Sequence, residues 1–353
     1  MSLENSRFTV VEKLSIRPNK IVFYNQFCLN SAKNALPLGK VSQETAKELR
    51  AIGVPVRIQP VCNKHNFELS IKATARIREK VTWLYELART KTVTTTGNKK
   101  VFSFKMNFIT LTLPAVQEHD TATITAVCLN QFLTECKERF GLANYVWRLE
   151  FQKNGNAHYH IATDSFIDYA SCKNIWNRCL QKLNYVARYG EKMQSLSFSD
   201  YVRDYGKSGE VPFNTLRERY GKGRADRWLN PNTVDVRAVS NAKNISFYIS
   251  KYITKKSDHT LNPIVSNREP SDTNLRLWFC SRSLSRLDKI SLFLDEYDAL
   301  ASACLSGLRS VEKYIFDYCQ IWYFSAVEQA SEVKRNLWQL YRRYSKSTGY
   351  APA

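Results

Sequence analysis

Two histidines lie on either side of a tyrosine in the stretch EFQKNGNAHYHIATD, residues 150–164, of a chain that has five histidines in all. The segments NYVWRLEFQ and AHYHIAT alternate, and KNGN between them supplies turn chemistry, so this stretch predicts a β-hairpin. Because strand side chains alternate faces, His158 and His160 point the same way, and Glu150 on the partner strand can face the same side. Two imidazoles and a carboxylate form a mixed ligand set for Mg²⁺ or Mn²⁺, with positions left open for phosphate oxygens.

The same pattern has a plainer interpretation. An H-x-H pair can simply line the polar face of a sheet, with no metal involved. Asp164 also lies near the histidines in sequence and is an alternative to Glu150 as the third ligand.

A second group of reactive side chains lies in NAKNISFYISKYITKK, residues 241–256, after the probable strand VDVRAV. On a helix the isoleucines of this stretch form one apolar stripe, with Tyr248 and Tyr252 just beside it and Lys251 and Lys255 beside the tyrosines. Ammonium groups next to phenols favour phenolate and stabilise charge on a phosphate. The alternative is that the tyrosines only widen the buried face of the helix.

The charge of the chain favours a polyanionic partner. Lys and Arg number 52 against 32 Asp and Glu, which leaves a formal net charge of +20 and a sequence pI near 9.5. Neutralising phosphates releases counterions, so we expect nucleic acid rather than a membrane or an acidic protein. No run of about eighteen apolar residues and no apolar signal core occurs, which predicts a cytoplasmic protein. The nine cysteines are scattered without a C-x-x-C pair, which predicts reduced thiols.

The elements around these motifs mix strands and helices. The stretch VFSFKMNFITLTLP, residues 101–114, predicts a strand, and a helix follows over about 123–140 and ends at Gly141. Before them, ATARIREKVTWLYELARTK predicts a helix, and TKTVTTTGNKK reads as a break between domains. These elements predict an α+β fold with a central antiparallel sheet and flanking helices.

Basic residues are interleaved with aromatic residues in LRERYGKGRADRWLNP, within the intervening segment 181–233. The cations of this stretch could follow a DNA backbone while the rings stack on bases. The alternative is an exposed, solvated loop. The candidate DNA-binding residues are Arg217, Arg219, Tyr220, Lys222, Arg224, Arg227 and Trp228.

Taken in order, FITLTLP, GNAHYH and YISKYITK resemble the three motifs of the HUH endonucleases that initiate rolling-circle replication. The last is similar to the two-tyrosine motif of the gene A protein of small isometric coliphages and of related phage initiators. The resemblance covers about residues 100–260. It implies that His158 and His160 bind the metal and that Tyr248 and Tyr252 are the nucleophiles. Relaxases share the histidine pair but carry their tyrosines upstream of it, so the order found here favours a replication initiator.

The resemblance implies a metal-dependent enzyme that nicks one strand of single-stranded or extruded origin DNA in a bacterial host cell. Tyrosine attack leaves a 5′-phosphotyrosine and a free 3′-OH, which a polymerase extends, and a second tyrosine rejoins the strand after a round of synthesis. Lys251 and Lys255 would hold the phosphate or lower the tyrosine pKa. The chain has no G-x-x-x-x-G-K-[ST] motif, so a host helicase is an expected partner. The sequence does not indicate an oligomeric state.

Two other functions use the same features. A two-tyrosine HUH transposase would have the same site, but such enzymes commonly carry a cysteine-rich zinc module, which is not seen in this sequence. A non-catalytic DNA-binding protein could retain the scaffold after losing the chemistry, yet both histidines, both tyrosines and both lysines are present. The expected domains are an N-terminal α/β extension over 1–95, an endonuclease domain over 96–260, and a mostly helical region over 261–353 that could bind DNA or a partner.

Overall fold

The computed structural model describes residues 8–17, 20–31, 34–37, 51, 69–94, 101–206, 209–239, 275–287, 290–293, 311–316 and 319–324. The chain forms two compact units. One consists of Met1–Asn66 with Arg286–Tyr350, and the other of Phe67–Ser285 with Ala351–Ala353. Among the described residues, no helix is both long and apolar enough to cross a membrane.

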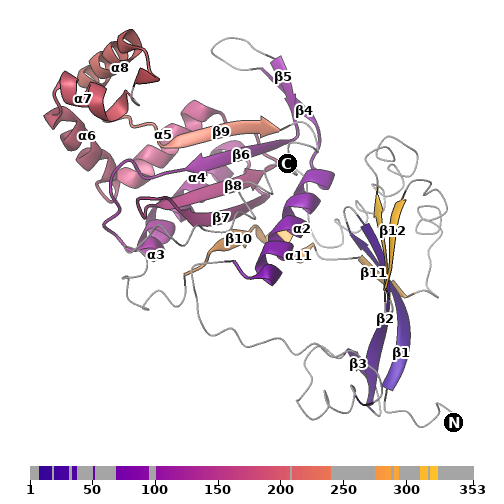
Figure 1. Cartoon of the computed structure of the whole chain (residues 1–353). Helices are drawn as coiled ribbons and strands as arrows, with labels where there is room; N and C mark the ends of the chain where they lie inside the picture. Colours follow the sequence, from indigo (N-terminus) through magenta and orange to yellow (C-terminus); the bar gives the residue numbers. More distant parts are fainter. Residues whose placement is uncertain are drawn as a thin grey trace. The chain divides into compact units, whose positions relative to one another are not determined.

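The first unit is built on a six-stranded antiparallel sheet made from both ends of the chain (Figure 1). Its strand order is β11-β1-β2-β13-β12, and β3 also pairs with β2. The strands are β1 (Phe8–Arg17), β2 (Lys20–Ser31), β3 (Asn34–Pro37), β11 (Ile290–Phe293), β12 (Val311–Phe316) and β13 (Cys319–Phe324).

This sheet differs from the mostly helical region expected over 261–353. Of that region, the described residues form strands β10 to β13 and the short helix α11 (Arg282–Arg286). The segments VEKYIF and CQIWYF are rich in β-branched and aromatic residues, which favour strands once a partner strand is available. That partner is β2, almost 300 positions earlier in the chain, so the local pattern alone could not reveal it.

The second unit holds the predicted central sheet, which is antiparallel with strand order β10-β7-β8-β6-β9 (Figure 1). This confirms the expected α+β fold. The predicted hairpin is β7 followed by β8, and the predicted strand VDVRAV is β9. The strands are β6 (Met106–Leu111), β7 (Tyr145–Phe151), β8 (Ala157–Thr163), β9 (Val234–Val239) and β10 (Trp278–Cys280).

One face of this sheet is covered by helices and forms the main core. The inward residues alternate along three strands, for example Ile109, Trp147 and Tyr159, and they pack against apolar residues of the helices. Asp120 and Asp168 cap the helices at their starts, and Gly141 ends α4 in the left-handed conformation at φ 66°. The helices are α3 (Thr121–Ile124), the π-helical turn η2 (Thr125–Leu129), α4 (Asn130–Phe140) and α5 (Tyr169–Gln181).

The cysteines of this core are free thiols, as the sequence predicts for reduced, buried cysteines. Cys128, Cys136, Cys172 and Cys179 are all buried among apolar side chains. Burial raises the pKa of each thiol above its ordinary value, so these side chains act as small apolar residues.

The other face of the sheet is covered only in part by the described elements. Helix α2 (Ile71–Leu87), capped by the Ser70 hydroxyl, contacts β7. A two-stranded ribbon of β4 (Lys91–Thr94) and β5 (Val101–Phe104) lies beyond it (Figure 1). The stretch 101–114, predicted as one strand, is therefore divided between β5 and β6. The predicted first domain ends near residue 95, whereas α2 and β4 belong to the unit that holds the central sheet.

Three helices between α5 and β9 form a helical insertion, which we define as residues 185–228. They are α6 (Tyr185–Ser195), α7 (Phe198–Tyr205) and α8 (Phe213–Ala225). The insertion has a small core of its own around Met193, Tyr201, Leu216 and Trp228. The chain after α8 turns sharply through Arg227 and Trp228, both with φ of 56°, which lays the Trp228 ring against Gly223.

Two glycines of α8 provide a matched test of this packing. A Cβ at Gly223 would lie 2.4 Å from the Trp228 ring, whereas a Cβ at Gly221 would meet nothing within 4 Å. We therefore expect Gly223→Ala to destabilise the insertion by about 1–3 kcal/mol through overpacking. Gly221→Ala should stabilise the helix by about 0.5–1 kcal/mol. Urea unfolding of both variants measures the difference, and equal effects would contradict the packing of Trp228 on Gly223.

Candidate active site on the central sheet

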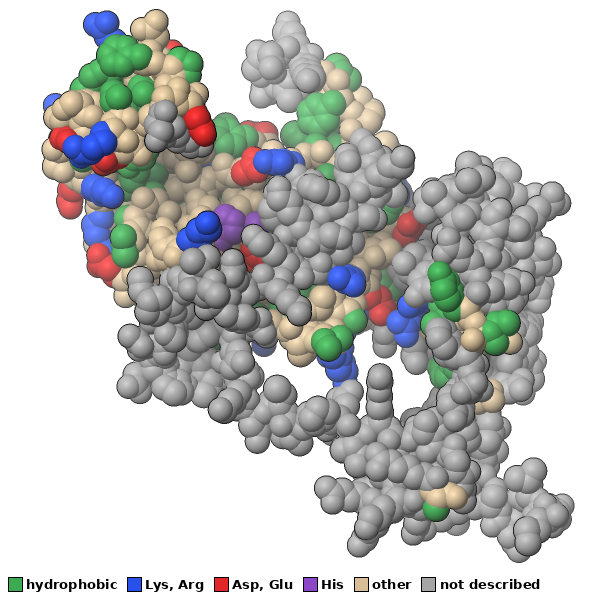
Figure 2. Space-filling view, in the orientation of Figure 1, with side chains coloured by type: hydrophobic (Ala, Val, Ile, Leu, Met, Phe, Trp, Pro, Cys, Tyr) green, Lys and Arg blue, Asp and Glu red, His purple; other side chains and the backbone are tan. Residues whose placement is uncertain are grey.

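The register of the hairpin brings the predicted metal-binding residues together. Glu150 on β7 pairs directly with His158 on β8, and Arg148 pairs with His160. All four side chains therefore lie on the face of the sheet opposite the main core. In the space-filling view, histidine side chains reach the surface over this part of the sheet, near basic and acidic side chains (Figure 2).

Tyr159, between the two histidines, points to the opposite face. It is fully buried in the main core, and its hydroxyl forms a 2.8 Å hydrogen bond with the Thr125 hydroxyl. Burial raises the pKa of this phenol well above its ordinary value. Tyr159 is therefore a core residue and is unsuited to attack a phosphate.

The three candidate ligands are in close contact. The Glu150 Oε2 atom lies 3.2 Å from His160 Nε2, and the rings of His158 and His160 are 4.5 Å apart at an interplanar angle of 79°. His160 is nearly buried, with a relative exposure of 9%. A contact of about 3 Å between two donor atoms is the spacing of neighbouring ligands around one cation at about 2.1 Å from each.

The protonation states suit metal binding. Burial, followed by the charge of His160, lowers the pKa of His158 to about 4, so its imidazole is neutral at pH 7. Burial alone would raise the pKa of Glu150, but the hydrogen bond from His160 and the charge of Arg148 hold it below its ordinary value. The pair thus offers a neutral imidazole and an ionised carboxylate, which are the forms that bind metals.

A further observation fits a bound cation. The His158 Nδ1 atom is buried without a hydrogen-bond partner among the described residues. Buried polar atoms are nearly always satisfied, so an orphaned imidazole nitrogen next to a carboxylate is consistent with an unseen ligand. Across the same described ranges, no three His, Cys, Asp or Glu side chains are arranged to hold a metal ion as they stand. The direct contact between Glu150 and His160 would have to open around the cation.

Asp164, the alternative third ligand, lies at the other end of β8. It follows His160 by four residues along an extended chain, a distance of about 13 Å at the usual rise of a strand. Its carboxylate is buried and accepts a 3.0 Å hydrogen bond from Asn144 Nδ2. The geometry therefore favours Glu150 over Asp164.

Arg148 is a site residue that sequence reasoning missed. Its guanidinium is 5% exposed and lies 3.0 Å from Glu150 Oε1 through Nη1. Burial lowers the pKa of Arg148, and the charge of Glu150 opposes that shift. The ion pair fixes one oxygen of Glu150 and leaves Oε2 directed at His160. The alternation of YVWRLEF places Arg148 and Glu150 on one face, which was the available signal.

Thr110 on β6 is a second residue that sequence reasoning missed. It pairs with His160 across the strands, and its Oγ1 lies 3.2 Å from His160 Nδ1. With Nδ1 donating to Thr110, the lone pair of Nε2 faces Glu150 and any bound cation, which is the usual way a second residue orients a metal-binding histidine. Thr110 lies in the FITLTLP motif, but its partner strand could not be known from local sequence.

Removing this contact should weaken metal binding. Thr110→Val keeps the size and β propensity of the side chain, but it deletes the oxygen that orients His160. We expect the affinity for Mn²⁺ to fall about 10- to 100-fold, measured by electron paramagnetic resonance titration of free Mn²⁺. Thr110→Ser keeps the oxygen and serves as the matched control. Equal Mn²⁺ affinity in the valine and serine variants would rule out this role for Thr110.

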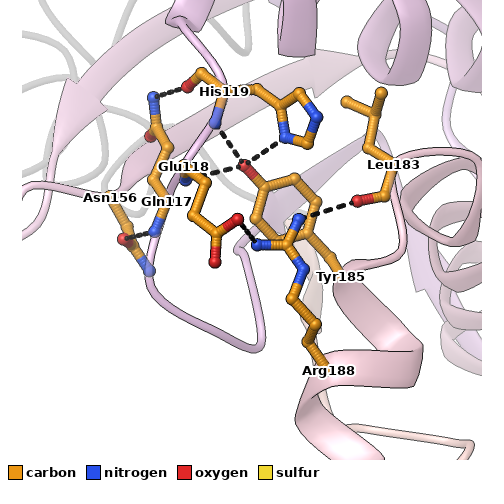
Figure 3. A network of polar contacts seen from close by, with 7 residues as sticks. All are labelled: Gln117, Glu118, His119, Asn156, Leu183, Tyr185 and Arg188. Carbon is orange, nitrogen blue, oxygen red and sulfur yellow. Dashed lines mark hydrogen bonds and ion pairs between the residues drawn. The ribbon is translucent and has the colours of Figure 1, made fainter.

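A polar network holds the hairpin turn just before His158 (Figure 3). The Gln117 amide donates to Asn156 Oδ1 at 2.9 Å, and Ala157 N donates to Gln117 Oε1 at 2.7 Å. Asn156 Nδ2 donates to the Ala115 carbonyl at 2.8 Å. The loop after β6 thus fixes the start of the strand that carries both histidines.

The same loop is attached to the start of the helical insertion. The Tyr185 hydroxyl accepts hydrogen bonds from the backbone amides of Glu118 and His119, each at 3.2 Å (Figure 3). Arg188, one turn further along α6, forms an ion pair with Glu118 and donates to the Leu183 carbonyl at 3.1 Å. The network is structural, and it connects α6 to the end of the sheet where the histidines lie.

The predicted nucleophiles and their neighbouring lysines lie outside the described residues. Tyr248, Lys251, Tyr252 and Lys255 belong to the segment 240–274, which follows β9 directly. Their proximity to the histidines therefore stays a prediction from sequence.

The predicted DNA-binding residues lie on α8 and the turn after it, and they fall into two groups. The rings of Tyr220 and Trp228 pack in the small core of the insertion, where Trp228 is 7% exposed and the Tyr220 hydroxyl donates to the Leu196 carbonyl. Their packing does not present them for stacking on bases, as the sequence had suggested. The cationic members, in contrast, are all exposed: Arg217, Arg219, Lys222, Arg224 and Arg227.

Comparisons with known proteins bear on the part of the chain that contains this site. No curated protein and no solved structure shows a significant match to the chain. Residues 106–257, from β6 through both histidines to both tyrosines, match a family model described as replication-associated protein, of the ORF2 and gene 2 protein type. This match supports a rolling-circle replication initiator.

Proposed function

We propose that this protein is a metal-dependent, site-specific endonuclease and strand transferase that starts rolling-circle replication by nicking one strand of origin DNA. The observation that carries the proposal is the convergence of His158, His160 and Glu150 on one open sheet face, inside the region that matches the replication-associated family. The two-tyrosine segment follows the edge strand β9 of the same sheet.

The chain would use these residues in a single displacement at phosphorus. The phenolate of Tyr248 or Tyr252 attacks the scissile phosphate of a single-stranded or extruded segment, and a new phosphotyrosine bond forms as the bond to the leaving 3′ oxygen breaks. That oxygen takes up a proton and becomes the free 3′-OH. A bound Mg²⁺ or Mn²⁺, held by the two histidines and Glu150, would withdraw charge from the phosphate oxygens.

Rejoining would reverse the same step. The phosphotyrosine retains the energy of the broken bond, so no nucleotide cofactor is needed. A second phenol at i+4 on a helix lies on the same side, one turn away, and can attack the regenerated origin after a round of synthesis. Lys251, between the two tyrosines, and Lys255 would lower the phenol pKa or hold the phosphate. A polymerase would extend the 3′-OH, and a host helicase would open the duplex.

The test uses the full chain and labelled single-stranded oligonucleotides that tile the replicon carrying its gene. We expect one oligonucleotide to give a covalent protein adduct with Mg²⁺ or Mn²⁺ and none with chelator. The released fragment should be extended by a DNA polymerase, because it ends in a 3′-OH.

The outcomes separate the proposal from its alternatives. A 5′ fragment ending in phosphate, with no protein adduct, would contradict tyrosine chemistry. DNA binding without cleavage of any oligonucleotide would favour a non-catalytic binding protein. Cleavage that needs two paired end sequences would favour a two-tyrosine transposase.

A further inference from the structure

Helix α8 has three longitudinal stripes of different character. The inner stripe, Leu216, Tyr220 and Gly223, recurs at i, i+4 and i+7 and faces the core of the insertion. Opposite it runs an exposed crest of short or polar residues at i, i+4, i+7 and i+11: Asn214, Glu218, Gly221 and Ala225. A Cβ at Gly221 would meet nothing within 4 Å, so the crest is open.

Cations occupy both shoulders of this crest. At 100° per residue, Arg217 and Arg224 lie on one side of it and Arg219 and Lys222 on the other. Lys222 pairs with Glu218 at 2.6 Å, and Arg224 Nη1 donates to the Gln194 carbonyl at 3.1 Å. Within the described ranges, Arg217 and Arg219 have no carboxylate partner, whereas Arg203 of α7 pairs with two aspartates. The unpaired positive charge is therefore concentrated on α8.

The shape of this surface fits double-stranded DNA better than a single strand. A single strand without sequence preference is bound by stacking its bases on exposed rings, but the rings of Tyr220 and Trp228 are packed inside. The major groove is about 12 Å wide and admits one α-helix, with a phosphate backbone on each side. A crest of short side chains lets the helix approach the base edges, and cations on both shoulders reach both backbones.

The insertion is attached at the end of the sheet that carries the histidines. The chain passes from the insertion into β9 at Val234, which pairs with Leu111, and Leu111 in turn pairs with Tyr159 between the two histidines. Tyr185 of α6 fixes the loop that holds the hairpin turn. Figure 1 shows the insertion beyond this end of the sheet, and Figure 2 shows basic side chains over its surface.

We infer that the helical insertion binds the double-stranded DNA beside the strand to be cut, with α8 in the major groove. This inference rests on the proposed function, because it assigns the duplex part of the same origin to a second surface. Asn214, on the crest, is a side chain that pairs with adenine at its major-groove edge. Arg217 and Arg219 contact phosphates of opposite strands.

The test measures fluorescence anisotropy of the full chain with a labelled duplex of about 20 base pairs, two helical turns, and with its separated strands. The double variant Arg217→Gln/Arg219→Gln should weaken duplex binding about 10-fold and reduce the salt slope by about 2, one unit for each phosphate that is no longer neutralised. Single-strand binding should change less than about 2-fold. Arg203→Gln removes a paired cation and should leave both affinities unchanged.

A second variant tests the groove without changing charge. Gly221→Phe adds bulk at the open crest and should weaken duplex binding about 10-fold, while Gly221→Ala keeps it. Thermal unfolding of both variants checks the fold. Equal losses for duplex and single strands would overturn the assignment in favour of single-strand binding, and no loss in either would mean that α8 is only a solvated surface.

Cleavage of single-stranded origin oligonucleotides separates this inference from the proposed function. If the α8 variants still form the covalent adduct but keep full duplex affinity, the inference fails and the nickase stands. If no adduct forms with any oligonucleotide, yet the variants lose duplex affinity selectively, the nickase fails and the duplex-binding surface stands.

Discussion

Replacing His160 with alanine is expected to lower metal-dependent strand cleavage about 1,000-fold, which corresponds to about 4 kcal/mol of transition-state stabilisation. His160 is the most connected of the candidate ligands, since its Nε2 faces Glu150 Oε2 at 3.2 Å and its Nδ1 lies 3.2 Å from Thr110 Oγ1. The change also leaves Glu150 beside Arg148 alone, so the carboxylate would turn toward the guanidinium. Cleavage rates with Mn²⁺ and with chelator measure the effect.

The control for this prediction is another histidine of the same unit. His119 lies in the polar network with Tyr185 and away from the sheet face, and its ring contributes one contact of 3.3 Å to the tyrosine hydroxyl. His119→Gln should keep cleavage within about 3-fold of the original, an effect below about 1 kcal/mol. If His160→Ala cleaves at the original rate with full dependence on Mn²⁺, the sheet face does not hold the catalytic metal.

Removing both phenols should have the largest effect of all. Tyr248→Phe/Tyr252→Phe keeps the aromatic rings but deletes both nucleophilic oxygens, so adduct formation should fall below detection, at least about 10,000-fold. Either single variant should still form an adduct through the remaining tyrosine. Rejoining, which needs both, should be lost in each single variant. Denaturing gels with labelled origin oligonucleotides measure adducts and joined products separately.

Tyr159→Phe is the matched control for the tyrosine variants. Its hydroxyl faces the main core and bonds to Thr125, so loss of that oxygen should cost about 1 kcal/mol of stability and leave the adduct intact. An adduct that persists in the double variant at positions 248 and 252 would show that another group is the nucleophile.

The hairpin and its site could be predicted because their determinants are local. Period-two alternation on both strands and the Asn154-Gly155 turn set the register, and the register alone places Glu150 opposite His158. Arg148 followed from the same alternation, but a buried arginine beside a candidate metal ligand is unexpected from residue type. Thr110 depended on β6 pairing with β8, a contact between residues 50 positions apart that local patterns do not specify.

The aromatic residues of the insertion show the opposite case. Tyr220 and Trp228 alternate with cations in sequence, which suggested stacking on bases. The competing signal was the i, i+4, i+7 spacing of Leu216, Tyr220 and Gly223, which is typical of the buried face of a helix. The turn through Arg227 and Trp228, with positive φ at two successive non-glycine residues, returns the indole to that face and was not predictable from local propensity.

The strands of the C-terminal region could not be predicted for a related reason. VEKYIF and CQIWYF are short apolar runs, and such runs fit a helix or a strand about equally well by periodicity alone. Pairing of β13 with β2 decides the matter, and that pairing joins the two ends of the chain in one sheet.

Identification of the residue that carries the DNA tests the central claim most directly. The adduct formed with Mn²⁺ and a labelled origin oligonucleotide would be digested with nuclease and protease and its peptides sequenced by mass spectrometry. The account predicts a nucleotide 5′-phosphate attached to Tyr248 or Tyr252, and no modified peptide from the His160→Ala variant. A nucleotide attached to any other residue, or an adduct that forms equally well with chelator, would contradict it.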